Sequence, residues 1–214
     1  MKLKLIIATI LFFGSLAHAQ GAKSNFSIGA GIEGVFPAAS FNRNPSAPEN
    51  STVQKGTNAV GYIGDLRYDF GRHSAVGIAV TWNRNTEVFF DGFTTATNHV
   101  QTNNAEIIAS YIIRLPARER VKPYFMIGGG VVHFSPTNDF STADNPSSQS
   151  KPTFAYGFGT DLNFNANWAL RLQYRGLVLA SPDFGLMDKT DYNNFGSGVK
   201  RHVPEPSVQI VYHF

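Results

Sequence analysis

Apolar residues recur at every second position in eight separate segments of the chain, the period of a β-strand whose two faces meet different surroundings. The segment 124–134 is apolar on both faces, so the pattern leaves its register open by one residue. The sequence predicts an all-β protein whose strands cover residues 26–32, 60–70, 76–82, 105–113, 124–134, 154–164, 168–174 and 208–214.

The alternate positions of these segments are polar, charged or very small. Their charged members are Glu33, Asp65, Arg67, Asp69, Glu106, Asp161, Arg171 and Arg175. In a soluble sandwich the apolar face would pack on a core, whereas in a transmembrane barrel it would face lipid and the polar face would fill the lumen. Alternation alone does not separate these two architectures.

The lengths of the connections favour the barrel. Short and long connections alternate strictly along the chain, as periplasmic turns and extracellular loops do in transmembrane barrels. The short ones are 71–73, 116–121 and 165–167, and the long ones are 37–57, 84–103, 135–152 and 179–204. We therefore expect an eight-stranded antiparallel up-and-down transmembrane β-barrel with both termini on the periplasmic side.

Two hairpins test the assignment of faces. Asp91-Gly92 is a typical two-residue turn, which would place Phe90 opposite Phe93 and, further down, Val80, Ile78 and Val76 opposite Asn103, Ala105 and Ile107. A three-residue turn at 165–167 would place Leu162 opposite Leu170 and Phe158 opposite Tyr174. Both hairpins bring apolar sets to one face. The first hairpin is expected to protrude from the membrane, with its tip at 91–92.

Aromatic residues gather near the expected strand ends, as in the girdles at the two membrane interfaces. They are Phe70, Trp82, Tyr111, Tyr124, Phe134, Phe164, Trp168, Tyr174 and Phe214.

The N-terminus resembles a secretory signal in its order of charges and apolar residues. Lys2 and Lys4 precede an apolar stretch over residues 5–13, and Ala17-His18-Ala19 forms a small-x-small cleavage site. We expect residues 1–19 to be removed and residues 20–214 to form the outer-membrane barrel domain.

Composition agrees with an exported membrane barrel. The chain has no cysteine, and its charged residues are 15%, against about 25% in ordinary soluble domains. The formal charge is +3, and Lys2 and Lys4 account for two of those charges, so nothing favours nucleic-acid binding. No stretch after residue 20 is apolar for long enough to form a transmembrane helix.

The last segment carries a family resemblance. Apolar residues alternate up to a C-terminal phenylalanine, at Val208, Ile210, Tyr212 and Phe214, and this pattern resembles the signal read by the barrel assembly machinery. The stretches 122–130 and 167–176 are similar to small outer-membrane barrels of the OmpA-transmembrane and OmpX type. Residues 180–185 and 205–208 resemble acidobacterial-type members with no known activity.

This resemblance implies a protein of the bacterial outer membrane, in contact with membrane lipid and lipopolysaccharide. It implies a monomer without a cofactor. No peptidoglycan-binding domain is expected after the barrel.

The eight alternate-face charges have two interpretations. An eight-stranded barrel is just wide enough for side chains to fill it, and buried charges must pair, which favours a static salt-bridge network. The alternative is a gate or a narrow path for small solutes, in which such pairs switch.

A catalytic alternative rests on His133 and Ser135. Residues two apart share a strand face, so the histidine is placed to act as base toward the hydroxyl, with Asp139 or Asp161 near. This resembles the lipid A deacylases of the PagL type. The expected context, Tyr174-Arg175-Gly176, lacks the histidine of that family.

The remaining candidates are weaker. The histidines show no metal-ligand spacing, so no metal site is expected. Phe89, Phe90 and Phe93 at the hairpin tip, and Phe184, Leu186 and Met187 in the last loop, are apolar enough to engage a partner or to cover the barrel mouth. We expect a non-enzymatic barrel that supports membrane integrity or surface interaction through its loops, with lipid acyl hydrolysis and a narrow pore as alternatives.

Overall fold

The computed structural model describes residues 25–42, 52–91, 95–116, 120–137, 141, 145–185 and 199–214. The described part of the chain contains no helix that is long and apolar enough to cross a membrane. Its strands are β1 (Phe26–Val35), β2 (Ser40–Asn42), β3 (Thr52–Gly56), β4 (Ala59–Asp69), β5 (Ser74–Asp91), β6 (Thr95–Arg114), β7 (Val121–Pro136), β8 (Gln149–Asn163), β9 (Trp168–Ala180) and β10 (Lys200–His213).

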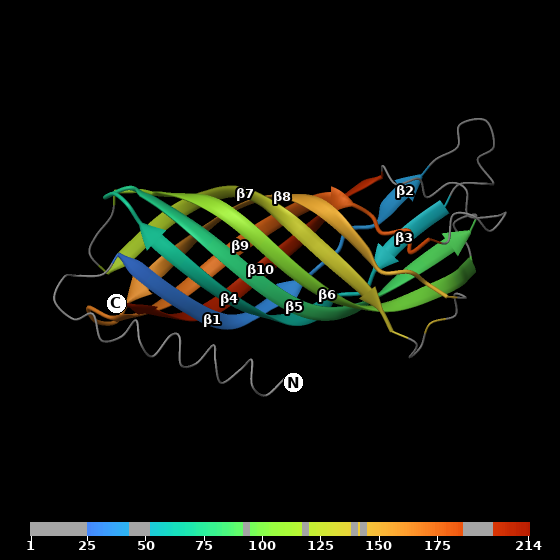
Figure 1. Ribbon diagram of the computed structural model, residues 1–214, viewed down its shortest axis with the longest axis horizontal. Coiled ribbons are helices and arrows are strands. Elements are labelled where there is room, and N and C mark those ends of the chain that lie inside the picture. The colour runs from blue at the N-terminus through green and yellow to red at the C-terminus, as the bar shows by residue number, and fades with distance from the viewer. Residues whose placement is uncertain are drawn as a thin grey trace.

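Eight of these strands close into an antiparallel barrel (Figure 1). Consecutive barrel strands pair in the order β1, β4, β5, β6, β7, β8, β9, β10, and β10 pairs with β1 to close the ring. Each barrel strand matches one of the predicted segments to within one residue at its shared end or extends beyond it, so the predicted fold is confirmed.

The exposure of side chains separates the barrel from a soluble sandwich. Large apolar residues such as Ile32, Val60, Ile78 and Ile107 are exposed on the outer face, while the alternate charged positions are buried inside. A soluble protein would reverse this distribution. The outer face is therefore suited to lipid and the inner face forms the packed interior.

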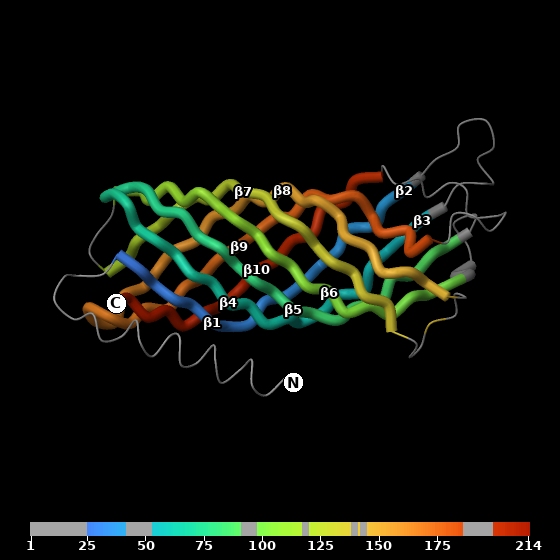
Figure 2. Tube along the Cα trace, in the orientation of Figure 1, coloured from blue at the N-terminus to red at the C-terminus, as the bar shows by residue number. Residues whose placement is uncertain are grey.

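One end of the barrel is extended by further pairing. β5 and β6 run beyond the other strands (Figure 2). β3 pairs with residues 87–91 of β5, and β2 pairs with β3. We call this the loop end. The C-terminal residue lies at the opposite end (Figure 1), which we call the C-terminal end. β2 and β3 fall in the predicted long connection 37–57. The alternation pattern did not indicate them, because they form by pairing with the edge of β5 beyond the barrel.

The register predicted for the first hairpin was wrong. Asp91 pairs with Thr95, a bulge lies at Phe89/Phe90, and below it Ile78 pairs with Ala109 instead of Ala105. In the observed register Val80 lies opposite Ile107, whereas the predicted one would place Asn103 beside it on the lipid-facing surface. The shift of four residues is even, so the assigned faces are unchanged. The remaining tip residues, 92–94, lie outside the described residues.

The second hairpin has the predicted register. Leu162 pairs with Leu170 and Phe158 with Tyr174. The turn is held by Asn165, whose side-chain oxygen accepts the backbone N–H groups of Asn167 at 2.9 Å and Trp168 at 2.8 Å. Asparagine commonly stabilises tight turns in this way.

The two apolar faces of β7 are resolved by the structure. Tyr124, Met126, Val132 and Phe134 are buried inside the barrel, while odd-numbered residues such as Ile127 are exposed. The placement of Tyr124 and Phe134 in the aromatic girdles was therefore wrong, because each fills space in the lumen. The outer face does expose Phe70, Trp82, Tyr111, Phe164 and Trp168.

Candidate functional site in the barrel lumen

The C-terminal half of the lumen holds two arginines and two aspartates, which we call the balanced cluster: Asp65, Arg67, Asp161 and Arg171. Arg171 donates from Nε and Nη2 to the two oxygens of Asp161, at 2.7 and 2.9 Å, and from Nη1 to Asp65 at 2.6 Å. Arg67 donates from Nε to Asp65 at 2.9 Å. All four side chains are buried and their charges cancel. Such bidentate arginine–carboxylate pairs are strong and geometrically specific.

Two neutral side chains complete this layer. Arg67 donates from Nη2 to Gln173 Oε1 at 2.7 Å and to the Tyr124 hydroxyl at 3.1 Å, and that hydroxyl donates to Gln173 at 2.8 Å. The guanidinium carbon of Arg67 lies 4.6 Å from the centre of the Tyr124 ring. The layer therefore links side chains of β4, β7, β8 and β9 by hydrogen bonds inside the lumen.

Asp69 lies apart from this cluster. It pairs with Arg114 at 2.6 Å, at the C-terminal end, where both side chains are partly exposed. It was predicted as part of the lumen network, and the structure gives it a separate pair.

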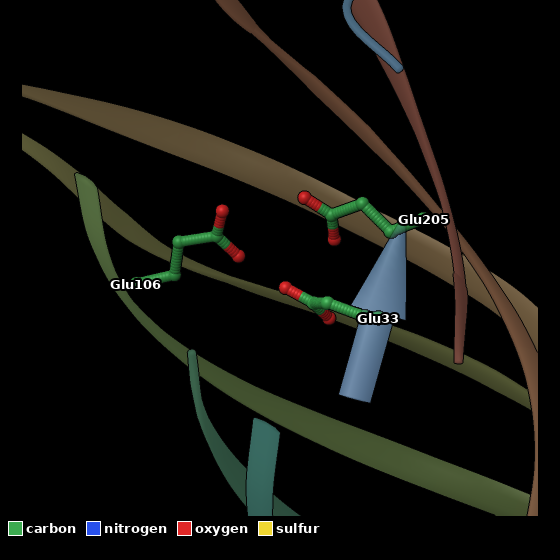
Figure 3. Close-up of side chains that lie close together, drawn as sticks. All are labelled: Glu33, Glu106 and Glu205. Carbon is green, nitrogen blue, oxygen red and sulfur yellow. The ribbon is translucent and has the colours of Figure 1, made fainter. Parts of the chain in front are cut away.

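The middle of the lumen holds three glutamates around one arginine, and we call Glu33, Glu106, Glu205 and Arg175 the acidic cluster. Arg175 donates from Nε to Glu205 at 2.7 Å, and from Nη2 to Glu106 at 2.9 Å and Glu33 at 3.3 Å. The three carboxylates point toward one another from different strands (Figure 3). Nη2 also donates to the Thr81 hydroxyl at 3.0 Å.

Glu205 was missed by the sequence analysis. The last strand was predicted from the alternation over residues 208–214, and Glu205 precedes it between Pro204 and Pro206, which lack N–H groups. The structure extends β10 back to Lys200. The alternation of inward Val203, Glu205 and Ser207 was the available signal.

Above the acidic cluster, toward the loop end, one further ion pair spans the lumen. Arg201 donates from Nη1 to Glu87 at 2.7 Å, and Gln54 donates to the same carboxylate at 3.0 Å. Over this pair lies an apolar layer that includes Phe89, Val100 and Phe134.

The last loop closes the mouth. Phe184 is fully buried, with its ring edge-on to Phe89 and Phe134 at 6.4 and 6.3 Å. The backbone supports this position, because Phe184 has φ 53° and Gly185 has φ 73°, which turn the chain back on itself. We call residues 181–185 the plug segment. The prediction that Phe184 covers the mouth agrees with this position, while Leu186 and Met187 lie outside the described residues.

Polar contacts hold the plug segment to three strands at the loop end, β2, β3 and β8. The Ser181 and Ser40 hydroxyls lie 2.9 Å apart, and Gln54 donates to the Pro182 carbonyl at 2.9 Å. Asp183 accepts a hydrogen bond from Gln149 and pairs with Lys151 at 3.8 Å. The segment is therefore anchored by its flanking residues as well as by Phe184.

A cavity of about 20 Å³ lies in the lumen between the acidic cluster and the apolar layer. This is room for about one water molecule. Its polar lining comes from Asn83, Asn85, Asn104, Glu106, Arg201 and Glu205.

In the structure, the histidine of the proposed hydrolase contacts a different serine, and Asp161 lies far from it. His133 is exposed, and its Nδ1 lies 2.9 Å from the Ser150 hydroxyl on β8 rather than at Ser135. Asp161 lies opposite Lys122, at the far end of the same strand pair, bonded to Arg171. Asp139 lies outside the described residues. Asp161 therefore lies too far along the strand pair to orient this histidine.

The C-terminal pattern faces outward. Val208 and Ile210 are exposed, and the ring of Tyr212 packs edge-on against Trp168 and Phe214, each at 5.0 Å. Its reading by the assembly machinery stays a prediction.

This fold and its charge-filled lumen define a class, the small integral β-barrel. A family model described as "Outer membrane protein beta-barrel domain" matches residues 5–202, so the chain belongs to that family. No curated protein matches the chain in sequence.

Solved structures share the fold at low identity. OprG from Pseudomonas aeruginosa has a TM-score of 0.58 at 16% identity, covering 91% of this chain and 98% of its own. Neisserial surface protein A has a TM-score of 0.57 at 15% identity, covering 91% and 100%. Ail of Yersinia pestis, in complex with a heparin analogue, has a TM-score of 0.53 at 18% identity, covering 90% and 100%. These structures share the fold, and the family match makes the protein an outer-membrane barrel.

Proposed function

We propose that this protein is a sealed, non-enzymatic barrel that presents the extended sheet at its loop end to partners outside the cell. One observation carries the proposal. Phe184 fills the mouth above stacked layers of bonded side chains, and the cavity found among these described residues holds only about 20 Å³. A solute path would require several buried ion pairs to break together, which is unfavourable.

The extended sheet supports the second half of the proposal. β2, β3 and the upper parts of β5 and β6 lie beyond the closed barrel (Figure 2). Phe41 on the outermost strand, β2, is 62% exposed. An exposed aromatic residue on a sheet edge is suited to contact with another surface.

Conductance tests the sealed lumen. Purified protein in planar bilayers should show no steady current. A steady current that changes in Arg171→Met would overturn the sealed barrel and support a narrow pore.

Surface contact is tested in a strain that lacks the gene, complemented with variants. Cells that carry Phe41→Ser should adhere less than cells that carry the wild type, and their sensitivity to detergent should stay at the wild-type level. The matched control is Phe164→Ser, which removes an equally exposed phenylalanine at the C-terminal end. If Phe41→Ser adheres like the wild type while the empty strain becomes detergent-sensitive, the role is membrane integrity and the surface proposal is wrong.

The hydrolase alternative is tested with lipid A. Purified protein should release no acyl chains above the level of Ser135→Ala and Ser150→Ala. Release that disappears in either variant would make the protein an enzyme.

A further inference from the structure

The acidic cluster is not neutral. It holds three carboxyl groups and one guanidinium, all buried, so with every group ionised two negative charges are uncompensated among its members. Arg201 is a further cation of the described lumen and also lines the small cavity, but it is matched one-to-one by Glu87 at 2.7 Å. Uncompensated charges inside a protein carry a large desolvation penalty.

Two of its oxygens have no hydrogen-bond partner among the described residues. They are Oε1 of Glu33 and Oε1 of Glu205, both buried. The other oxygen of each carboxylate faces Arg175, so these two remain as surplus acceptors.

An independent group of amides points to the same place. Asn83 donates from Nδ2 to Glu106 and Asn85 donates to Glu87, each at 3.4 Å. A carboxylate can only accept hydrogen bonds, so the amide nitrogens of Asn83 and Asn85 must face the glutamates. Their amide oxygens then face Asn104, whose Nδ2 donates to them at 2.8 and 3.0 Å. This fixes the orientation of Asn104 and leaves its Oδ1 buried with no donor among the described residues.

Asn104, Glu106 and Glu205 line the small cavity together. Its volume of about 20 Å³ admits a single small ion or water molecule. Oxygen atoms from carboxylates and an amide carbonyl are the ligands preferred by hard divalent cations such as Ca²⁺. The charge of such an ion equals the charge that the acidic cluster lacks.

We propose that this cavity binds one divalent cation of the Ca²⁺ type, held by the free oxygens of Asn104 and Glu205 together with Glu106. Glu33 contributes charge from the adjoining position, where the three carboxylates have oxygens within 4.8 Å of one another. Because Phe184 covers the mouth above, the ion enters as the barrel folds. It links β6 to β10 and neutralises the centre of the lumen.

The test uses the full mature chain refolded in nonionic detergent, with Ca²⁺ added before refolding or with EDTA. Equilibrium dialysis with ⁴⁵Ca²⁺ should give one ion per chain, and the heat-modifiable band should survive to a higher temperature with Ca²⁺ than with EDTA. Mg²⁺ and Na⁺ arms define the ion preference.

Two variants and a matched control locate the ion. Glu106→Gln and Asn104→Ala should each weaken Ca²⁺ binding at least tenfold and abolish the thermal shift. Asn103→Ala removes the neighbouring amide, which bonds to the exposed Arg84, and should leave both unchanged. Binding that persists in the first two variants would place the ion elsewhere and overturn the proposal.

Protons are the competing means of neutralisation. If the protein binds no ⁴⁵Ca²⁺ in the dialysis, and in EDTA it is stabilised by acidification alone, the lumen is neutralised by protons and the cation proposal is wrong.

Discussion

The balanced cluster and the acidic cluster lie in the same lumen, yet they differ in how their charges are matched. In the balanced cluster two arginines meet two aspartates, and both oxygens of Asp161 accept hydrogen bonds from Arg171. In the acidic cluster one arginine faces three glutamates, and two carboxylate oxygens have no partner among the described residues.

Buried charges are therefore fully paired in one part of this barrel and incompletely paired in another. The balanced cluster neutralises itself and is explained as structure. The acidic cluster requires a further source of positive charge, because its own groups, when ionised, leave two negative charges in a closed space. Substitutions in the two clusters are therefore expected to change the stability of the barrel differently.

The largest effect is expected from removing each arginine. Arg171→Met leaves two buried aspartates without this arginine, and Arg175→Met leaves three buried glutamates without theirs. Each variant should lose about 3–5 kcal/mol of stability, and Arg175→Met should lose more. The measurement is the urea midpoint of the heat-modifiable band. Arg84→Met, at an exposed arginine, should stay within about 0.5 kcal/mol. A milder effect for Arg175→Met than for Arg171→Met would contradict the charge imbalance.

Removing one carboxylate charge should act in opposite directions in the two clusters. Asp161→Asn takes a matched partner from Arg171 and should lower stability by about 2–3 kcal/mol. Glu106→Gln relieves repulsion and, in EDTA, should leave stability at or above the wild-type level. Urea midpoints of the two variants under one buffer check this, and a loss of stability in both would remove the distinction between the clusters.

The plug segment should contribute less than the clusters beneath it. Phe184→Ala should lower stability by about 2 kcal/mol, below the usual range for a buried phenylalanine because a loop can partly collapse into the space. Phe164→Ala, at an exposed site, serves as the control. Equal urea midpoints for the two variants would show that the mouth does not depend on Phe184.

The smallest effect is expected at the pair that lies outside both clusters. Asp69→Asn breaks a partly exposed contact with Arg114, which should change stability by about 0.5 kcal/mol or less. High salt should reduce even this difference, whereas the effect of Asp161→Asn should be nearly insensitive to salt. A large, salt-resistant loss in Asp69→Asn would place this pair within the buried network.

The sequence by itself determined the architecture and the faces. Alternation with period two assigns each side chain inward or outward, and the rhythm of short and long connections separates a barrel from a sandwich. Inward positions such as Glu33, Asp65 and Arg171 follow directly from that period. In β7 both faces are apolar, so the pattern did not assign them. Tyr124 and Phe134 were therefore predicted in the aromatic girdles, although they lie in the lumen.

Only the tertiary structure decided which inward groups meet. An even shift of register preserves every face, so alternation did not reveal that Ile78 lies opposite Ala109. The meeting of Glu33, Glu106 and Glu205 depends on the closure of the barrel, which brings β1, β6 and β10 around one point of the lumen. The burial of Phe184 likewise depends on a space that exists only after the strands have closed, and no local pattern encodes that space.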